Sequence, residues 1–419
     1  MTMRTQAVLC MVWAALASSP ARAEALCDGV FHWLDVPGTE CLDGSQTGVE
    51  YLCQTGSTSA PLLVYIEGGG ACWDGPTCNC QPDAFGCCTS PTAIISWSFW
   101  NKSLSFDGKT WAQSYWGGGP TGPAASGCSI GGSGPGSVGA AFVGPTSPFN
   151  QNWNIFHIGY CTGDLHAGDA VRSYPNGSGV ITAHHRGYRN MKLDLAVARS
   201  LFPDPRRVAV WGYSAGAYGI DCNLTQIRGT WPGVKMASLQ NAYAPFESIY
   251  ATMWPAIEQG WGVWHPDPID VSIVEDTCPI AIPQGSTEAW SLTFMTNYNH
   301  LYNSSVRKAT TDDYSDGTLD FFACVTGATP DANGSCAAAV SNSLEDALAL
   351  IGDDPAFRVY YHTGTCHSGR EDDGNAASGG LTSCDYDVMT QPPAKKNGAH
   401  FNDWVNAWLN DSPSWRNVQ

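Results

Sequence analysis

Residues 208–219 read VAVWGYSAGAYG and contain the pattern on which the fold prediction depends. The first four residues, Val208–Trp211, are apolar residues of the kind that form buried strands. Small residues flank Ser214, and a helix-compatible segment follows. A strand that turns sharply into a helix needs small neighbours, because the two elements approach closely at the turn. The stretch therefore predicts a strand–turn–helix unit with Ser214 at the turn.

Further apolar runs and helical patterns alternate along the chain. The predicted strands are Leu62–Ile66, Trp153–Ile158, Val208–Trp211, Leu292–Thr296 and Phe357–Tyr361, and the predicted helices include Asn190–Leu201 and Asn402–Leu409. This alternation is typical of a doubly wound α/β protein with a mostly parallel sheet. No linker divides the chain, so we expect a single domain over residues 24–419 with long insertions.

The N-terminal segment and the cysteines indicate export. Residues 1–23 have a basic start, an apolar stretch and an Ala-Arg-Ala ending, which predicts a signal peptide cleaved before Glu24. The chain has 17 cysteines, and 16 remain after Cys10 is removed with this segment. An even number predicts up to eight disulfides that staple the insertions of a secreted protein. Clustered cysteines at 72–88 are a weaker candidate for zinc, because paired CxxC spacing and histidine are lacking there.

The charge of the chain limits its partners. Removal of Arg4 and Arg22 leaves 18 basic residues against 38 acidic ones, a net charge of −20. Such a surface repels nucleic acid and anionic lipid. No later stretch has the ~20 apolar residues that a membrane span requires. We expect no nucleic-acid or membrane partner, and a monomer.

A long loop with aromatic residues before it is a second feature of the sequence. Residues 117–145 are mostly Gly, Pro, Ser and Ala, and such long loops in compact domains are often functional. Four tryptophans precede it, at positions 97, 100, 111 and 116. These side chains are candidates for a platform under a sugar ring or an acyl chain, or for ordinary core.

Ser214 is the candidate nucleophile, and a glycine-rich stretch supplies candidate partners for it. The sequence EGGG at 67–70 follows the predicted strand Leu62–Ile66. Backbone amides there, together with the amide of Ala215, are suited to binding a developing oxyanion. A phosphate-binding loop is disfavoured, because no Gly-Lys-Ser/Thr follows. This chemistry requires neither a metal nor a cofactor, and we expect neither.

A general base is expected after the last strand. His367 comes just after the predicted strand Phe357–Tyr361, and the histidine is the last member of a triad in the order Ser…Asp…His. His362, at the end of that strand, and His400, before the C-terminal helix, are the alternatives.

Five motifs in this order carry a resemblance to a known family. They are EGGGACW, GYCTGDLHAGD, AHHRGYRN, GYSAGAYG and GTCHSG, spread over about residues 60 to 370. The set resembles the pectin acetylesterase family, to which the Wnt-deacylating enzyme Notum belongs. The resemblance implies an α/β-hydrolase fold and a serine esterase. It places Ser214 as nucleophile, His367 as base, and Gly69, Gly70 and Ala215 in the oxyanion hole. YCTGD takes a structural place beside the turn.

The third member of the triad departs from the family's pattern. The family has a Tyr-Asp pair after the strand before the histidine's strand, which we take as Leu292–Thr296. The nearest matches here carry asparagine, at Asn303 and Asn299, and we predict Asn303. An amide orients a histidine without stabilising its charge. Asp312 and Asp313 are the alternatives.

These features together predict a secreted serine esterase that works through an acyl-enzyme. The resemblance implies O-acetyl groups on a polysaccharide as substrate, with pectin first. Neutral acetylated xylan or small esters suit the acidic surface better. A longer-acyl esterase and a catalytically impaired glycan-binding protein are the other interpretations.

Overall fold

The computed structural model describes the parts of the chain that form the sheet, its helices and several loops. These are residues 26–29, 31–53, 56–78, 147–149, 152–177, 179–244, 257, 260–262, 305–351, 354–362, 395–396 and 399–418. The predicted signal segment, the loop 117–145 with its four preceding tryptophans, and the predicted strand Leu292–Thr296 lie outside them. Predictions about those segments therefore stay predictions.

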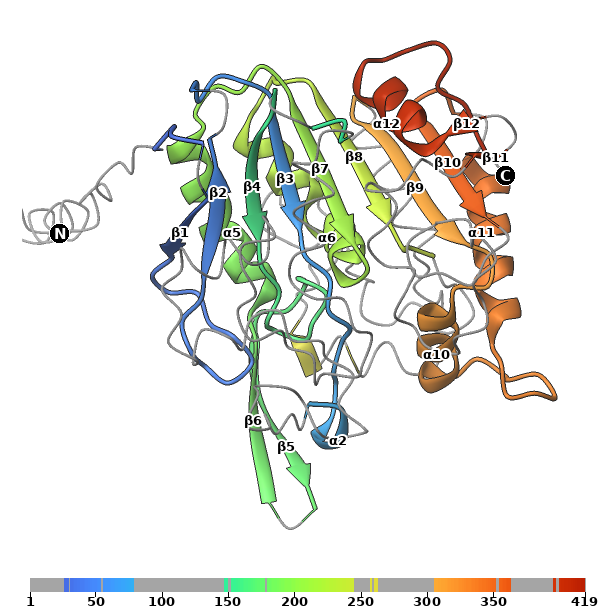
Figure 1. Cartoon of the computed structure of the whole chain (residues 1–419). Coiled ribbons are helices and arrows are strands. Elements are labelled where there is room, and N and C mark those ends of the chain that lie inside the picture. The colour runs from blue at the N-terminus through green and yellow to red at the C-terminus, as the bar shows by residue number, and fades with distance from the viewer. Residues whose placement is uncertain are drawn as a thin grey trace, which may run out of the picture.

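A sheet of eight strands forms the centre of the structure (Figure 1). Its order is β1-β2-β4-β3-β7-β8-β9-β10. The strands are β1 (Phe31–Asp35), β2 (Gly48–Leu52), β3 (Leu62–Ile66), β4 (Asn154–Ile158), β7 (Val208–Tyr213), β8 (Met236–Asn241), β9 (Arg307–Asp313) and β10 (Phe357–His362). Strand β2 is antiparallel to both neighbours, and the strands from β4 to β10 run parallel. The predicted class, a doubly wound and mostly parallel α/β sheet, is confirmed.

The central strands are apolar on both faces because each face packs against helices. On β3, Val64 and Ile66 join one core cluster with side chains of α5 (Gly187–Leu201) and α6 (Ala215–Thr230). The alternate residues Leu63 and Tyr65 join another cluster with α12 (Phe401–Leu409). Side chains of a strand alternate between faces, so a strand buried twice reads as a continuous apolar run.

Most of the sequence predictions for this core hold. The predicted strands at 62–66, 153–158, 208–211 and 357–361 correspond to β3, β4, β7 and β10. The two predicted helices correspond to α5 and α12. Strands β8 and β9 were not predicted, because neither has an apolar run like those of β3, β4, β7 and β10. β9 reads RKATTDD, and six of its seven residues are buried.

The placement of β9 corrects one step of the sequence argument. The strand before β10 in the chain, and beside it in the sheet, is β9 and not Leu292–Thr296. The strands were predicted from runs of apolar residues, and β9 has no such run because most of its side chains are polar. The carboxyl end of this strand carries Asp312 and Asp313.

Smaller elements lie outside the sheet. A hairpin of β5 (Ala170–Asn176) and β6 (Gly179–His185) extends beyond the sheet in Figure 1. Helices α10 (Gly317–Thr326) and α11 (Ala337–Ile351) lie between β9 and β10 in the chain. The short helix α2 (Gly75–Cys78) follows β3, and the pair β11 (Lys395–Lys396) and β12 (Ala399–His400) precedes α12.

Disulfides staple the described segments as expected. The pairs are Cys27–Cys53, Cys41–Cys161, Cys72–Cys78 and Cys324–Cys336, and Cys222 is also disulfide-bonded. Cys41–Cys161 joins residues 120 positions apart. A crosslink of this span reduces the conformational freedom of the unfolded chain by more than a short one does. Among the described helices, none combines the length and the apolar character needed to cross a bilayer.

Candidate active site

Ser214 occupies a strained turn at the carboxyl end of the central strand β7. β7 ends at Tyr213 and α6 begins at Ala215, so Ser214 is the single residue between them. Its backbone has φ 51° and ψ −121°. Residues other than glycine rarely adopt positive φ. The backbone strain of this conformation costs about 1–3 kcal/mol and persists mainly at functional sites. This is the geometry of a nucleophile elbow.

The glycines of GYSAG are required by close contacts between backbones. A Cβ atom on Gly212 would lie 2.3 Å from the carbonyl oxygen of Gly216. A Cβ atom on Gly216 would lie 2.1 Å from the carbonyl oxygen of Ile66, at the end of β3. Neither distance allows a side chain. The pattern that predicted the turn is therefore explained by the packing of β7, α6 and β3 against one another.

The glycine-rich loop after β3 lies against this turn. A Cβ atom on Gly68 would lie 2.3 Å from the Tyr213 carbonyl oxygen and 2.8 Å from the Ser214 Cβ. Two residues further on, Gly70 has φ 74°, a left-handed conformation that favours glycine. Gly70, Ser214 and Ala215 line one cavity, and Gly69 lies between Gly68 and Gly70 in the same loop. The structure thus brings together the predicted nucleophile and the segments predicted to bind an oxyanion.

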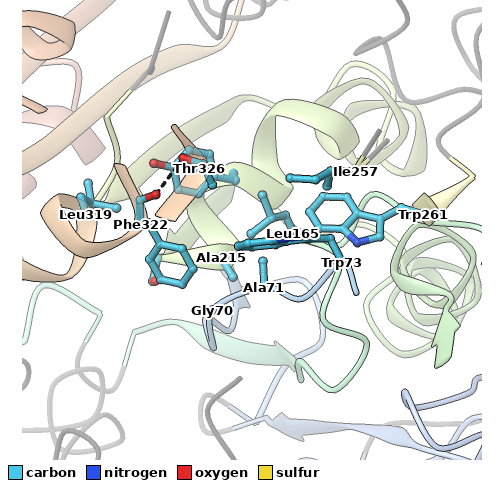
Figure 2. Close-up of a pocket in the computed structure, with 12 residues that line it drawn as sticks. Gly70, Ala71, Trp73, Leu165, Ala215, Ile257, Trp261, Leu319, Phe322 and Thr326 are labelled. Atoms are coloured by element: carbon cyan, nitrogen blue, oxygen red, sulfur yellow. Dashed lines mark hydrogen bonds between the residues drawn. The ribbon is translucent and has the colours of Figure 1, made fainter. Parts of the chain in front are cut away.

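The cavity beside Ser214 has mainly apolar walls. It has a volume of about 50 Å³ and opens to solvent. Figure 2 shows its lining residues, which include Trp73, Leu165, Tyr218, Ile257, Trp261, Leu319 and Phe322. Two of the polar tips bond to backbone, because Trp261 Nε1 donates to the Cys72 carbonyl at 2.7 Å and the Tyr218 hydroxyl donates to the Ala244 carbonyl at 3.0 Å. The aromatic surfaces are left to contact an apolar group.

Most residues of this cavity lining are not predicted by the sequence motifs. Trp73 follows EGGGAC directly, so its place beside the oxyanion loop could have been read from the motif. Leu319 and Phe322 come from α10, which no motif connects to the site. The four tryptophans considered as a platform lie outside the described residues.

The predicted base and the predicted third residue both lie outside the described residues. These are His367, Asn303 and the alternative Asn299. The prediction of Asn303 depended on Leu292–Thr296 being the neighbour of the histidine's strand, a place that β9 holds. In a Ser…Asp…His order the acid follows the strand before the histidine's strand. Residues at the end of β9 therefore fit this place by topology.

The two aspartates at the end of β9 are fully buried but differ in their surroundings. Asp312 is in register with Tyr361, whose side chain belongs to the core cluster under α10 and α11. Burial, followed by the nearby carboxylate of Asp316, raises the pKa of Asp312 well above its usual value. Asp316 caps α10 by accepting from the amides of Thr318 and Leu319, each at 2.8 Å. Asp312 thus lies beside a helix cap in surroundings that favour its protonated form.

Asp313 is oriented differently. It is in register with His362, the last residue of β10, and successive side chains of a strand point to opposite faces. It therefore faces away from the α10 cap and lies beside the end of β10, the strand after which His367 follows in the chain. Its amide donates to Asp312 Oδ1 at 2.8 Å, which fixes the end of β9.

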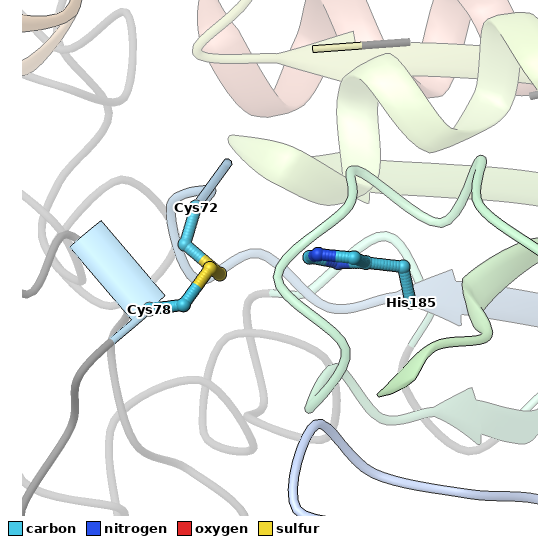
Figure 3. A group of neighbouring side chains, drawn as sticks. All are labelled: Cys72, Cys78 and His185. Atoms are coloured by element: carbon cyan, nitrogen blue, oxygen red, sulfur yellow. A yellow bond between two sulfur atoms is a disulfide. The ribbon is translucent and has the colours of Figure 1, made fainter. Parts of the chain in front are cut away.

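Two groups of side chains have the composition of a metal site but are disulfides. Cys72, Cys78 and His185 lie together, as Figure 3 shows, yet the two sulfur atoms are bonded to each other. The ring of His185 contacts the Thr162 carbonyl and the Tyr174 hydroxyl instead. The second group contains the Cys324–Cys336 disulfide. Neither group offers a thiolate, which is the form of cysteine that binds metals.

Comparison with known proteins supports the fold. No protein-family model and no curated protein matches the sequence. Among solved structures, the Wnt deacylase Notum from Drosophila matches with a TM-score of 0.51 and 16% sequence identity, over 93% of this chain and 95% of that one. Strand order, elbow and this likeness together define an α/β-hydrolase-like fold. The expected fold is confirmed, and at this identity the likeness shows no more than the fold.

Proposed function

We propose that this chain is a serine carboxylic-ester hydrolase. The observation that carries the proposal is the position of Ser214, which lies in a strained elbow and shares one cavity with Gly70 and Ala215. A retired enzyme has no physical need to keep a strained turn of this kind.

The reaction follows from this arrangement. The base, for which His367 is our candidate, takes the proton of Ser214 while the serine oxygen attacks the ester carbonyl. Amides of Gly69, Gly70 and Ala215 bind the oxyanion, and each such donor is worth roughly 3 kcal/mol of transition-state stabilisation. The alcohol leaves with the proton, and water then releases the acid from the acyl-enzyme. No step needs a metal or a cofactor.

We assign the orienting carboxylate to Asp313, ahead of Asp312 and of the asparagines. Burial and the nearby Asp316 carboxylate raise the pKa of Asp312, which makes it less suited to stabilise a positively charged histidine, and Asp312 lies beside the α10 cap. Asp313 lies on the opposite face at the end of the same strand. An aspartate in this place also removes the need for an asparagine triad, which the sequence alone suggested.

The substrate is an ester whose acyl group fits an apolar cavity. The aromatic and aliphatic walls around Trp73, Trp261 and Phe322 can contact the carbons of an aliphatic acyl chain. This favours a longer acyl group over the O-acetyl group of a polysaccharide. Four disulfides among the described residues and the acidic composition support a secreted enzyme.

Two measurements on the purified protein test this function. Wild type is expected to hydrolyse p-nitrophenyl esters, with octanoate preferred over acetate, and Ser214→Ala is expected to lose this activity. A fluorophosphonate probe is expected to label wild type and not Ser214→Ala. Glycan binding without turnover or labelling would instead favour the binding-protein interpretation, and a steep preference for acetate would restore the acetylesterase.

A further inference from the structure

The loop that carries the proposed oxyanion donors cannot fix its own conformation. Three successive glycines, Gly68–Gly70, have no side chains with which to anchor it. Glycine also has the widest choice of backbone conformations, so peptide rotation costs least there. The orientation of these amides must therefore be set by contacts from elsewhere in the molecule.

The segment Tyr160–Gly168, which contains the YCTGD motif, supplies these contacts at both ends of the loop. At the start, the Tyr160 amide donates to Glu67 Oε2 at 3.0 Å, and His166 Nε2 lies 2.9 Å from the Glu67 carbonyl oxygen. Burial lowers the pKa of His166 to about 4, so at neutral pH the ring is uncharged and bonds this carbonyl as an N–H donor. At the other end, the Cys72 amide donates to the Gly163 carbonyl at 2.8 Å.

The middle of the loop is held by one hydroxyl group. The Tyr160 hydroxyl donates to the Gly70 carbonyl oxygen at 2.8 Å and accepts from the Leu165 amide at 2.9 Å. Because the Leu165 N–H can only donate, the single hydroxyl proton is directed to Gly70. Tyr160 is 1% exposed, and burial raises its pKa well above the usual value, so the donor stays protonated.

This bond fixes the direction of a peptide group beside Ser214. A trans peptide points its carbonyl and its N–H in opposite directions, so a Gly70 carbonyl on Tyr160 directs the Ala71 N–H the other way. Gly70 and Ala71 both line the cavity, and Tyr160 does not. A Gly70 carbonyl rotated into the cavity would bring negative partial charge to the place where the oxyanion forms.

We propose that Tyr160 is a positioning residue for the oxyanion hole: its hydroxyl keeps the Gly70 carbonyl out of the cavity and directs the N–H of the same peptide, that of Ala71, toward it, beside the proposed donors Gly69 and Gly70. This role is additional to the structural place beside the turn that the resemblance implies for the YCTGD motif. The proposal rests on the proposed esterase function, and it concerns transition-state stabilisation alone.

The first test is Tyr160→Phe, which removes the hydroxyl and keeps the ring. Its kcat on a p-nitrophenyl ester is expected to fall about 10–100-fold with KM within twofold, since loss of a whole oxyanion donor costs 10²–10³ in kcat. Tyr51→Phe is the matched control, because it removes the hydroxyl of another buried tyrosine, which lies on β2 and accepts from the Leu26 amide. The control is expected to keep wild-type kcat.

The second readout separates positioning from a general loss of structure. The Ser214 oxygen adds to the carbonyl carbon of an alkyl trifluoromethyl ketone, and the serine proton passes to the base. The carbonyl oxygen of the ketone becomes an oxyanion in the hole. The affinity of the ketone for Tyr160→Phe is expected to fall by the same factor as kcat. The corresponding alcohol, which cannot form the adduct, is expected to bind as it does to wild type.

A second variant covers the case in which Tyr160→Phe does not fold. His166→Leu removes a different contact to the same loop and carries the same expectation of lower kcat at constant KM. A folded variant of either kind with wild-type kcat, or with equal losses for ketone and alcohol, overturns the inference. If wild type itself hydrolyses no ester, the proposed function fails instead, so the two failures are distinguishable.

Discussion

The cavity has two walls that are built in different ways. The elbow wall comprises Ser214, Ala215 and the glycine loop with its supporting segment Tyr160–Gly168. It is held by backbone hydrogen bonds and by contacts between backbones that leave no room for side chains. The α10 wall comprises Leu319 and Phe322, and it is held by the Asp316 cap and the Cys324–Cys336 disulfide; the end of β9 comes directly before it in the chain. In the elbow wall the backbone positions are fixed by close contacts. In the α10 wall the side chains line the cavity, and we expect substitutions there to be tolerated.

The largest effect is expected where the α10 wall meets the chemistry. Asp313→Asn is expected to lower kcat by up to about 10⁴-fold, the cost of this exchange in a related triad, because an amide cannot stabilise a protonated histidine. Asp312→Asn is expected to cost less than about 10-fold, since a neutral acid and an amide are close in shape and charge. Steady-state kinetics of both variants, with Asn303→Ala beside them, measures this. A larger loss in Asp312→Asn or in Asn303→Ala would move the third role to that residue.

The next effect tests the steric argument for the elbow wall. Gly216→Ala places a Cβ atom against the Ile66 carbonyl oxygen, so β3 and α6 must separate. A displacement of about 1 Å at the nucleophile costs about 10²-fold in rate. We expect at least that loss in kcat, together with a lower melting temperature. Gly229→Ala, in the same helix with no atom within 4 Å of the added Cβ, is the control and is expected to match wild type.

The same contrast explains what the sequence could and could not predict. The elbow and the glycine loop were predicted because their geometry demands particular small residues at fixed spacing. β9 was not, because Lys308, Thr310 and Asp312 are buried polar side chains in a strand, and an apolar pattern does not detect them. Phe322 illustrates the same limit, since its place in the cavity depends on how α10 packs. The role of His367 stays a prediction.

A smaller effect is expected from the α10 wall on substrate choice. Phe322→Ala enlarges the cavity and leaves the elbow wall unchanged, because Phe322, labelled in Figure 2, belongs to α10. One methylene in an apolar pocket is worth about 1–3 kcal/mol of discrimination. We expect the preferred acyl length to increase, with kcat/KM for the longest esters rising about 10-fold relative to acetate. Phe321→Ala, at a position 50% exposed on the same helix, is the control. An unchanged acyl profile in Phe322→Ala would remove α10 from the specificity site.

The last effect concerns stability and not rate, and the two walls are expected to respond to pH in opposite directions. Burial lowers the pKa values of His157, His166 and His185 to about 4 from about 6.5. The folded state therefore disfavours their protonation, and stability around the elbow wall falls as pH drops from 6.5 toward 4, by up to about 1.4 kcal/mol per pH unit for each histidine. Burial raises the pKa of Asp164 to about 6, which offsets one of the three.

At the end of β9 the sign is reversed. The pKa of Asp312 is raised, so the folded state favours its protonated form and the stabilisation is lost as pH rises through that pKa. Hydrogen exchange at pH 5 and pH 8, corrected for intrinsic exchange rates, measures both regions in one sample. Peptides from residues 154–168 are expected to open more at pH 5, and peptides from 307–320 more at pH 8. A shift in the same direction for both would mean that the walls open as one unit, and the division between them would then have no energetic basis.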